Sequence, residues 1–278
     1  MIVDCHSHFI QPEYFGGPLC REWEEAGYHP YPKMTYEEFD KALKPVDRAL
    51  VFGVTANALG VKTPHEAIAD VVSRKPEKYI GFMALDPTDP RAIEEMDYCV
   101  ADLGLKGIKL YPTMALFDVT EECFHPFFRR ARYHGLPILL HFGASPFPQA
   151  RMKYSQPLLL DEVAAAFPDL KMIIAHMGHP WQKDTIIILR KHKNVFADVS
   201  GLWHRPWEGY NALVSSMEWS ITDKLLFGSD YPIWTPSEAI AGLRAINEKV
   251  SGTGLPQVSE ELIESIINRE ALELLGLD

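Results

Sequence analysis

The sequence has few cysteines, fewer basic than acidic residues and no long apolar run. Its 278 residues include only four cysteines and no C-x-x-C pair, which excludes a disulfide framework and a cysteine zinc knuckle. With 38 acidic and 27 basic residues, a net charge of −11 and no dense Lys/Arg cluster, we expect no nucleic-acid partner. No run approaches about 18 apolar residues, and the first residues do not resemble a signal peptide. We therefore expect a cytoplasmic protein with no membrane association.

Short apolar, β-branched runs recur about every 32 residues along the chain, at 2–3, 49–52, 80–83, 108–110, 138–140, 172–174, 195–197 and 225–227. This period is the length of one strand–loop–helix–loop unit, and near-continuous apolar strands are typical of a covered parallel sheet. Eight such units predict an α/β fold, a (β/α)₈ TIM barrel, as one domain over residues 1–278. A doubly wound open sheet is the rival, but no glycine-rich phosphate turn follows the first run.

Helix-spaced apolar residues between these runs predict helices at 36–43, 64–74, 90–103, 121–134, 157–167 and 236–248. An extra C-terminal helix is predicted over 259–275, because Ser259 can cap its start and Gly276 can end it.

Residues 9–33 form a connection too long for an ordinary barrel loop after the first strand. The segment holds four prolines, three glycines and six aromatic residues, namely Phe9, Tyr14, Phe15, Trp23, Tyr28 and Tyr31. This composition favours an ordered lid over the C-terminal end of the barrel, where active sites lie. A packed loop that contacts no substrate is the alternative.

Polar residues interrupt or follow the apolar runs at their C-terminal ends. They are His6 and His8 after the first run, Lys109 in the fourth, and His141, His176 and Asp230 after the fifth, sixth and eighth. Side chains alternate along a strand, so His6 and His8 point the same way, as two ligands of one ion must. Each feature alone is weak evidence, but together they predict a metal site. Imidazole and carboxylate suit Zn²⁺, with Mn²⁺ or Fe²⁺ as competitors.

This order of residues resembles the amidohydrolase superfamily of metal-dependent barrels. The phrases Val-Asp-Cys-His-Ser-His, Gly-Ile-Lys-Leu-Tyr-Pro, Ile-Ile-Ala-His-Met-Gly and Phe-Gly-Ser-Asp-Tyr-Pro are most similar to its amidohydrolase-related branch, called amidohydrolase 2. That branch contains both hydrolases and decarboxylases. The resemblance spans residues 2–275 and does not single out a substrate.

The resemblance implies roles for the strand-end residues. His6, His8, His141 and Asp230 match the ligands of a single divalent ion, and one ion is favoured over two. Asp230 would also carry a proton, and His176 would face the metal-bound water, which makes these two the catalytic candidates. In binuclear relatives the lysine at the position of Lys109 is carbamylated, and here it would hold a second ion with His141 and His176. The alternative is a plain Lys109 that pairs with a carboxylate or contacts substrate.

The function implied is hydrolysis of an amide, lactone or ester in a small organic substrate by metal-activated water. The alternative is non-oxidative decarboxylation of an aromatic or unsaturated acid at the same site. The family's decarboxylases are generally longer than 278 residues, which favours hydrolysis. A barrel that binds ligand without catalysis is a third class, disfavoured because no expected site residue is missing.

Residues just beyond the strands are candidates for contacts to substrate. Tyr111, Trp203 and Arg205 are the substrate-binding predictions, and a guanidinium such as that of Arg205 can bind a carboxylate with two parallel hydrogen bonds. Asp198 is the candidate partner of a ligand histidine. Barrels of this kind commonly dimerise, so a homodimer is the one protein–protein contact we anticipate.

Overall fold

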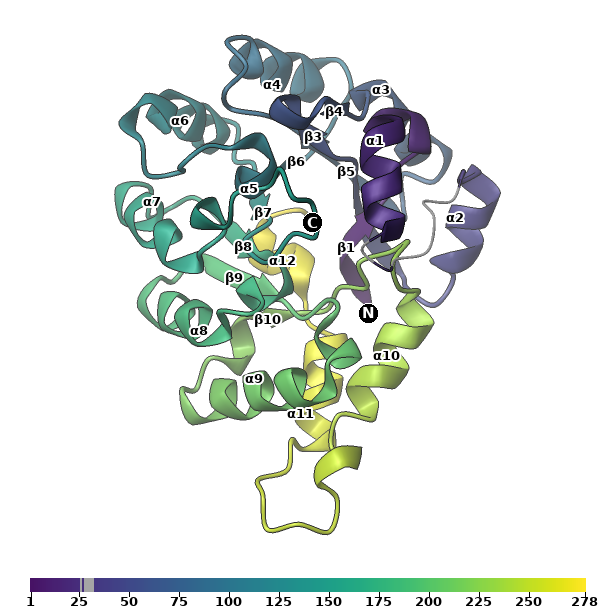
Figure 1. The fold of residues 1–278 in the computed structure, drawn as a ribbon, viewed down its shortest axis with the longest axis vertical. Helices are drawn as coiled ribbons and strands as arrows, with labels where there is room; N and C mark the ends of the chain where they lie inside the picture. The colour runs from purple at the N-terminus through teal and green to yellow at the C-terminus, as the bar shows by residue number, and fades with distance from the viewer. Residues whose placement is uncertain (26, 28–32) are drawn as a thin grey trace.

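Eight parallel strands form a nearly closed barrel inside a ring of helices (Figure 1). The computed structural model describes residues 1–25, 27 and 33–278. In the order of their pairing, the barrel strands are β1 (Val3–His8), β2 (Arg48–Phe52), β5 (Tyr79–Ala84), β6 (Gly107–Leu110), β7 (Ile138–Leu140), β8 (Met172–Ile174), β9 (Val195–Asp198) and β10 (Leu225–Leu226). Each strand overlaps one of the eight apolar runs, so the predicted (β/α)₈ barrel is confirmed.

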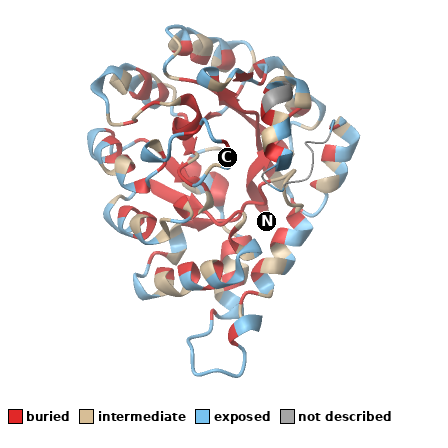
Figure 2. Cartoon of the chain, viewed as in Figure 1, coloured by how far each residue is buried: buried red, intermediate tan, exposed pale blue. Residues whose placement is uncertain are grey.

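Helices surround the strands and bury one face against them, as the colouring of Figure 2 shows. The ring consists of α2 (Tyr36–Ala42), α3 (His65–Arg74), α4 (Ala92–Ala101), α6 (His125–Tyr133), α7 (Leu160–Ala166), α8 (Gln182–Lys191), α9 (Pro206–Glu218) and α10 (Pro236–Arg244). The six helices predicted between strands are present, with ends that differ by a few residues. Helices α8 and α9, the short α5 (Pro112–Ala115) and the hairpin of β3 (Thr55–Ala56) and β4 (Val61–Lys62) were not predicted.

Short 3₁₀ turns connect several of these elements. They are η1 (Asn57–Leu59), η2 (Glu122–Phe124), η3 (Met152–Tyr154), η4 (Pro157–Leu159), η5 (Ala175–Gly178), η6 (Leu202–His204), η7 (Thr222–Lys224) and η8 (Glu248–Val250). Of these, η5 and η6 follow β8 and β9 and border the candidate site.

The seam between β1 and β10 is closed by main-chain and side-chain hydrogen bonds together. The Asp230 N–H donates to the His6 carbonyl at 2.8 Å. Beside it, the buried Asp4 carboxylate accepts hydrogen bonds from Ser229 Oγ at 2.6 Å, Ser229 N at 2.9 Å and His6 N at 3.0 Å. The seam therefore joins the two segments that carry His6 and Asp230.

The single helix predicted over 259–275 was wrong, because the chain forms two helices there, α11 (Glu260–Ile267) and α12 (Ala271–Leu275). At the bend between them, the Arg269 guanidinium donates to the Thr222 carbonyl at 3.1 Å and to Ser265 Oγ at 3.3 Å. The bend turns α12 beneath the barrel, where Leu272 and Leu275 are buried (Figure 1). Burial of these leucines outweighs the gain from continuing one helix.

One buried cluster fills the inside of the barrel and is separate from the larger cluster between strands and helices. It contains Val3, Cys5, Leu50, Phe52, Ile80, Phe82, Leu139, Ile173, Ala175, Phe196 and Leu226, and Ala271, Leu272 and Leu275 of α12 belong to it as well. Gly107 of β6 leaves room for the Phe82 ring, since a Cβ there would lie 2.4 Å from a ring carbon. The apolar filling leaves the opposite end of the barrel for polar side chains.

The long segment after β1 forms a helix, α1 (Pro12–Glu25), interrupted by Gly16 at φ 70°. This helix contacts the loop that follows β7. The Trp23 and Phe147 ring centroids are 6.0 Å apart, and Gln149 Nε2 donates to Glu22 Oε1 at 2.6 Å. The described part of the segment thus forms a helix that was not predicted, and the lid over the site stays a prediction beside its alternative, a packed loop. Tyr28 and Tyr31 lie outside the described residues.

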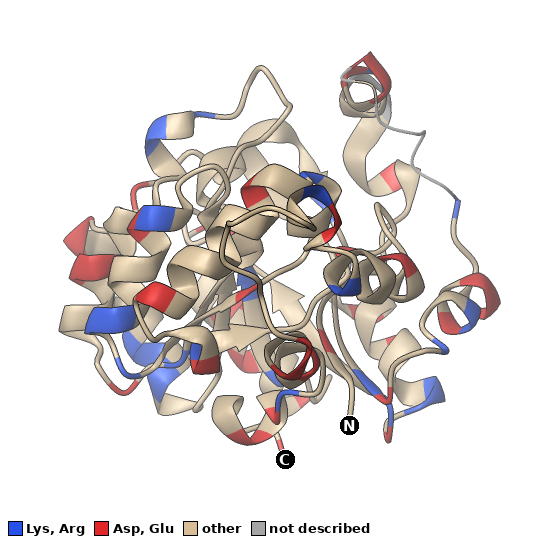
Figure 3. Cartoon of the chain, turned by 90° about the horizontal axis from the view of Figure 1, so that it is seen from below, with Lys and Arg blue, Asp and Glu red and all other residues tan. Residues whose placement is uncertain are grey.

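The outer surface carries both signs of charge, interspersed over the helices in the view of Figure 3. In residues 1–25, 27 and 33–278, no helix is both long and apolar enough to cross a bilayer.

The space over Gly107 allows a matched test of the interior packing. We expect Gly107→Ala to lower the free energy of unfolding by about 1–3 kcal/mol, because the new methyl group collides with Phe82. The control is Gly254→Ala, where a Cβ meets no atom within 4 Å. Urea unfolding of both variants makes the comparison, and equal stabilities would contradict this packing.

Candidate metal centre

The candidate site is built at the C-terminal ends of five barrel strands. Strand β1 ends at His8, β9 ends at Asp198, and His141, His176 and Asp230 follow β7, β8 and β10. Parallel strands place these ends on one side of the barrel, which is where barrel enzymes carry their active sites.

An irregularity in β1 turns its two histidines into the site. Val3 and Cys5 belong to the interior cluster, so strict alternation would point His6 and His8 away from it. The pairing of β1 with β2 shifts register between Asp4 and Ser7, where three steps along β1 match two along β2. Such a bulge reverses the phase of the strand, and bulges commonly re-aim side chains beside active sites.

Three electron-rich atoms converge in the site. His6 Nε2 and His8 Nε2 are 3.2 Å apart, and they lie 3.4 Å and 3.3 Å from Asp230 Oδ1. These separations match ligands about 2.0–2.1 Å from one central Zn²⁺-like ion. All three residues are buried, so water does not screen their mutual repulsion.

The hydrogen-bond partners of the two histidines direct both Nε2 lone pairs into the site. His6 Nδ1 lies 2.9 Å from Asp198 Oδ2, and a carboxylate can only accept, so His6 donates from Nδ1. The Tyr111 hydroxyl donates to the Gly53 carbonyl at 2.9 Å, so its oxygen can accept from His8 Nδ1 at 3.4 Å. Metal-binding histidines are oriented by outer partners in this way.

The electrostatics keep the three candidate ligands in the forms that bind a cation. Burial, reinforced by Lys109, lowers the pKa of His6 to about 3, and burial also lowers the pKa of His8. Burial alone would raise the pKa of Asp230, but the nearby histidines hold it well below its usual range. Metal ligands must be deprotonated, so the donor set fits a divalent ion.

Asp198 organises a second group of close ligand atoms, which consists of His6, His176 and Asp198. Its Oδ1 accepts from His176 N at 3.0 Å, Ser200 N at 3.1 Å and the Ser200 hydroxyl, while Oδ2 takes His6. Burial alone would raise the pKa of Asp198, but His6 and these donors hold it low. We interpret this group as a hydrogen-bonded support for the His6–His8–Asp230 group.

His176 and His141 lie beside the three converging atoms. The His176 ring centroid is 4.6 Å from that of His6 and 5.3 Å from that of His141. His141 Nε2 is 3.3 Å from the Ala144 carbonyl, and burial holds the pKa of His141 well below its usual value. Of the two ligand groups found among the described residues, His141 belongs to neither. Its role as a ligand therefore stays a prediction.

Lys109 is fully buried inside the barrel. Its Nζ lies 4.8 Å from the Tyr111 ring centre and 5.1 Å from that of Phe52, and it has no hydrogen-bond partner among the described residues. Burial lowers its pKa to about 7. The structure thus places Lys109 between two aromatic faces and not in a pair with a carboxylate.

The three predicted substrate contacts have different surroundings. Tyr111 is buried and supports His8, as described above. Trp203 is half-buried and packs on α10, where a Cβ at Gly242 would lie 2.3 Å from its ring. Arg205 is exposed at the start of α9. Sequence reasoning assigned no role to Ser200 or Asp4. The available signals were the position of Ser200 two residues after Asp198 and of Asp4 two residues before His6.

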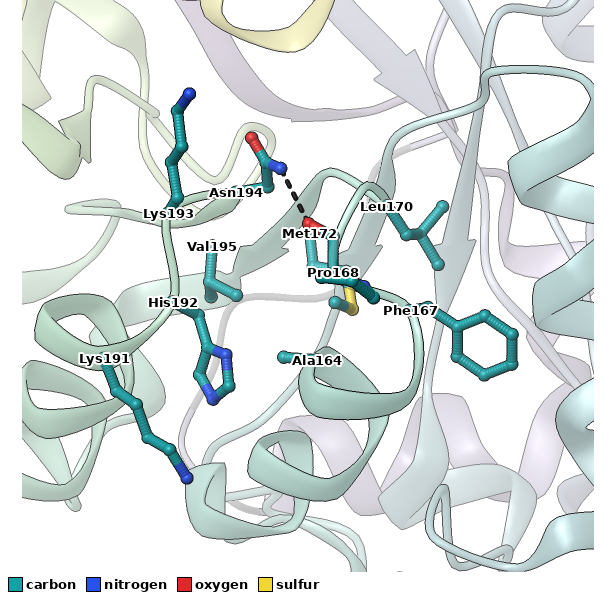
Figure 4. A pocket seen from close by; sticks show the side chains of 10 residues that line it. All are labelled: Ala164, Phe167, Pro168, Leu170, Met172, Lys191, His192, Lys193, Asn194 and Val195. Carbon is teal, nitrogen blue, oxygen red and sulfur yellow. Dashed lines mark hydrogen bonds between the residues drawn. The ribbon is translucent and has the colours of Figure 1, made fainter.

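A small cavity of about 170 Å³ lies elsewhere, at the N-terminal ends of β8 and β9 (Figure 4). Lys191 and His192 on its rim are both paired with Asp161, at 2.7 Å and 2.6 Å. Asn194 Nδ2 donates to the Pro168 carbonyl at 2.7 Å. This cavity is at the opposite end of the barrel from the candidate metal centre.

A (β/α)₈ barrel with histidine and carboxylate groups at its strand ends defines a class of metal-dependent barrel enzymes. The model of the amidohydrolase family, in its amidohydrolase-2 form, matches residues 3–277. The chain therefore belongs to this family and is an enzyme of the amidohydrolase superfamily.

Two curated relatives are similar to the chain. The 2-amino-3-carboxymuconate-6-semialdehyde decarboxylase of Dictyostelium discoideum is 24% identical over 251 residues, which cover 77% of this chain and 66% of that protein. The gamma-resorcylate decarboxylase of Rhizobium radiobacter is 27% identical over 143 residues, which cover 41% and 43%. The match thus spans less than two thirds of either relative's own length.

Solved structures share the fold at lower identity. A TIM-barrel protein from Bordetella bronchiseptica has a TM-score of 0.75 at 20% identity and covers 99% of this chain and 98% of its own. A probable 2-pyrone-4,6-dicarboxylic acid hydrolase from Acinetobacter baumannii has a TM-score of 0.70 at 18% identity, covering 99% of both chains. A dihydroxybenzoic acid decarboxylase from Polaromonas sp. JS666, with bound manganese, has a TM-score of 0.68 at 16% identity, covering 99% and 97%.

The donors around Asp198 lead to a prediction for metal affinity. In the Asp198→Asn variant the amide oxygen must face the three donors at Oδ1, so the NH₂ group faces His6 Nδ1. Nδ1 then accepts, and the His6 proton moves to Nε2, where it blocks the ion. We expect Mn²⁺ and Zn²⁺ affinity to fall about 10- to 100-fold.

Equilibrium dialysis against a competing chelator measures this loss. The matched control is Asp161→Asn, which changes the same group on the outer surface. Wild-type affinity in the Asp198→Asn variant would contradict the role of Asp198.

Lys109 leads to a prediction for stability against pH. The amine has a pKa of about 7 when folded and about 10.4 when unfolded. Between these values the unfolded state binds the extra proton, so Lys109 costs stability as pH falls from about 10 to 7. We expect Lys109→Met to be more stable than wild type at pH 7 by on the order of a few kcal/mol, and by much less at pH 10.

Urea unfolding in chelator at both pH values makes this measurement. The control is Lys106→Met, which removes an exposed amine just before β6. A stability difference between Lys109→Met and wild type that is the same at pH 7 and pH 10 would contradict the prediction.

Proposed function

We propose that this protein is a metal-dependent non-oxidative decarboxylase of an aromatic or unsaturated carboxylic acid. The observation that carries the proposal is the convergence of His6 Nε2, His8 Nε2 and Asp230 Oδ1 within 3.4 Å of one another. The reaction class is supported by the two curated relatives, both of which are decarboxylases. They favour this alternative over the hydrolysis that chain length suggested.

His6, His8 and Asp230 would hold one divalent ion, with Mn²⁺ and Zn²⁺ as the candidates. When bound, the ion supplies positive charge that anchors the substrate carboxylate and a neighbouring hydroxyl or carbonyl oxygen. Asp198 and Tyr111 keep the two imidazole lone pairs aimed at that position.

Decarboxylation needs a proton at the carbon that loses CO₂. The bond between that carbon and the carboxyl carbon breaks, its electron pair stays on the substrate, and the substrate carbon takes the proton. Asp230 is held as a carboxylate, which makes it a poor proton source at neutral pH. We assign this delivery to His176, an imidazole beside the candidate ligands whose ring centroid is 4.6 Å from that of His6.

The proposed reaction is tested by CO₂ release from a panel of hydroxybenzoates and unsaturated acids, with Mn²⁺- and Zn²⁺-loaded protein assayed side by side. In parallel, acid production is measured with a panel of lactones, esters and amides. Release of CO₂ supports decarboxylation, whereas acid production without CO₂ release would refute it and show that the protein is a hydrolase.

Asp230→Asn is the sharpest variant for the proposed site. It removes the anionic ligand while its main-chain bond to His6 can persist, so we expect a folded protein whose kcat falls at least about 100-fold. Asp223→Asn, at an exposed carboxylate before β10, is the control. Circular dichroism, metal content and CO₂ release are measured on both. A metal-loaded Asp230→Asn protein with wild-type kcat would refute the assignment.

A further inference from the structure

Ser200 lies between three groups of the site. Its Oγ is 2.8 Å from His176 Nδ1 and 3.4 Å from His6 Nδ1, and it makes a short hydrogen bond to Asp198 Oδ1. Ser200 is fully buried directly after β9. Sequence reasoning assigned it no role.

The direction of each hydrogen bond follows from what each group can donate. Asp198 is a carboxylate and can only accept, so the Ser200 hydroxyl proton is directed to Asp198. A lone pair of Ser200 Oγ is then left to face His176 Nδ1. The main-chain carbonyl of Ser200 is a second acceptor, 3.2 Å from the same nitrogen. Two acceptors at one nitrogen require that His176 Nδ1 carries a proton.

The main chain of His176 is held in place by the same carboxylate. Its N–H donates to Asp198 Oδ1 at 3.0 Å, and His176 and Met177 adopt left-handed conformations, with φ of 53° and 48°. Left-handed non-glycine residues cost about 1–3 kcal/mol each and persist only where surrounding contacts impose them. Ring and backbone of His176 are therefore both fixed from β9.

We propose that Ser200 is a positioning residue that commits His176 to the Nδ1–H tautomer and leaves Nε2 as the nitrogen that faces the substrate. The inference rests on the proposed function for its catalytic consequence: Nε2 takes a proton from solvent, gives it to the substrate carbon as CO₂ leaves, and the ring returns to the neutral Nδ1–H form. The tautomer itself follows from the hydrogen bonds and does not depend on which reaction is catalysed.

The tautomer is tested by NMR of the Zn²⁺-loaded full chain with ¹⁵N-labelled histidine. The His176 signals are assigned by their loss in a His176→Gln sample. We expect the wild-type ring to carry its proton on Nδ1. In Ser200→Ala the carbonyl at 3.2 Å still accepts from Nδ1 but the closer hydroxyl acceptor is lost, so we expect the Nδ1–H population to fall and a population of Nε2–H to appear. Ser200→Thr, which keeps the hydroxyl, should restore the wild-type populations.

Kinetics give the second readout. We expect kcat for Ser200→Ala to fall about 10- to 100-fold with KM and Zn²⁺ affinity little changed, and Ser200→Thr to recover most of it. The control is Ser216→Ala, which removes a buried hydroxyl that donates to the Ala212 carbonyl within α9.

Three results would overturn the proposal. They are a wild-type ring protonated on Nε2 alone, an unchanged tautomer in Ser200→Ala, or a kcat for Ser200→Ala equal to that of Ser216→Ala. The wild-type spectrum decides the tautomer even where Ser200→Ala does not fold. Absence of CO₂ release from the wild type would refute the proposed reaction and leave the NMR result standing as a separate test.

Discussion

The candidate site depends on one buried carboxylate, that of Asp198, which can only accept hydrogen bonds. One of its oxygens accepts a hydrogen bond from the His6 ring, and the other accepts hydrogen bonds from the main-chain N–H groups of His176 and Ser200. Because every donor is directed to Asp198, the His6 Nε2 lone pair is turned toward His8 and Asp230. Three electron-rich atoms then face one another in a buried site, an arrangement that a divalent cation stabilises.

The barrel supplies the geometry that this arrangement needs. Apolar side chains fill the inside of the barrel, and α12 covers its N-terminal end. The polar groups of the site therefore lie at the C-terminal end. The register shift in β1 brings His6 and His8 into phase with that end, and the Asp4–Ser229 contact ties β1 to the segment carrying Asp230. Lys109 is the exception, a fully buried amine between aromatic rings whose burial without a hydrogen-bond partner among the described residues costs stability.

Histidine and carboxylate at a barrel mouth can serve hydrolysis or decarboxylation, because both reactions use a cation to hold an oxygen-rich substrate. The groups around the ion decide between them by determining where a proton can be delivered. In the proposed reaction Asp230 stays a carboxylate, and His176 Nε2 takes a proton from solvent and gives it to the substrate carbon. This division of roles agrees with the reaction named for both curated relatives.

Much of the fold could be predicted because eight apolar runs recur at a regular spacing. The candidate site residues His6, His8, His176 and Asp230 could be predicted because each is a polar residue at the end of such a run. The break between α11 and α12 was not predictable, since it depends on burying Leu272 and Leu275 against strands far away in the sequence. The same holds for the setting of His141 beside the Ala144 carbonyl and for Ser200, whose partners lie up to 194 residues away. By itself the sequence determined which ligand types are present and on which strands. Only the tertiary structure decided their tautomers and which atoms meet, because hydrogen-bond direction depends on neighbours that periodicity does not encode.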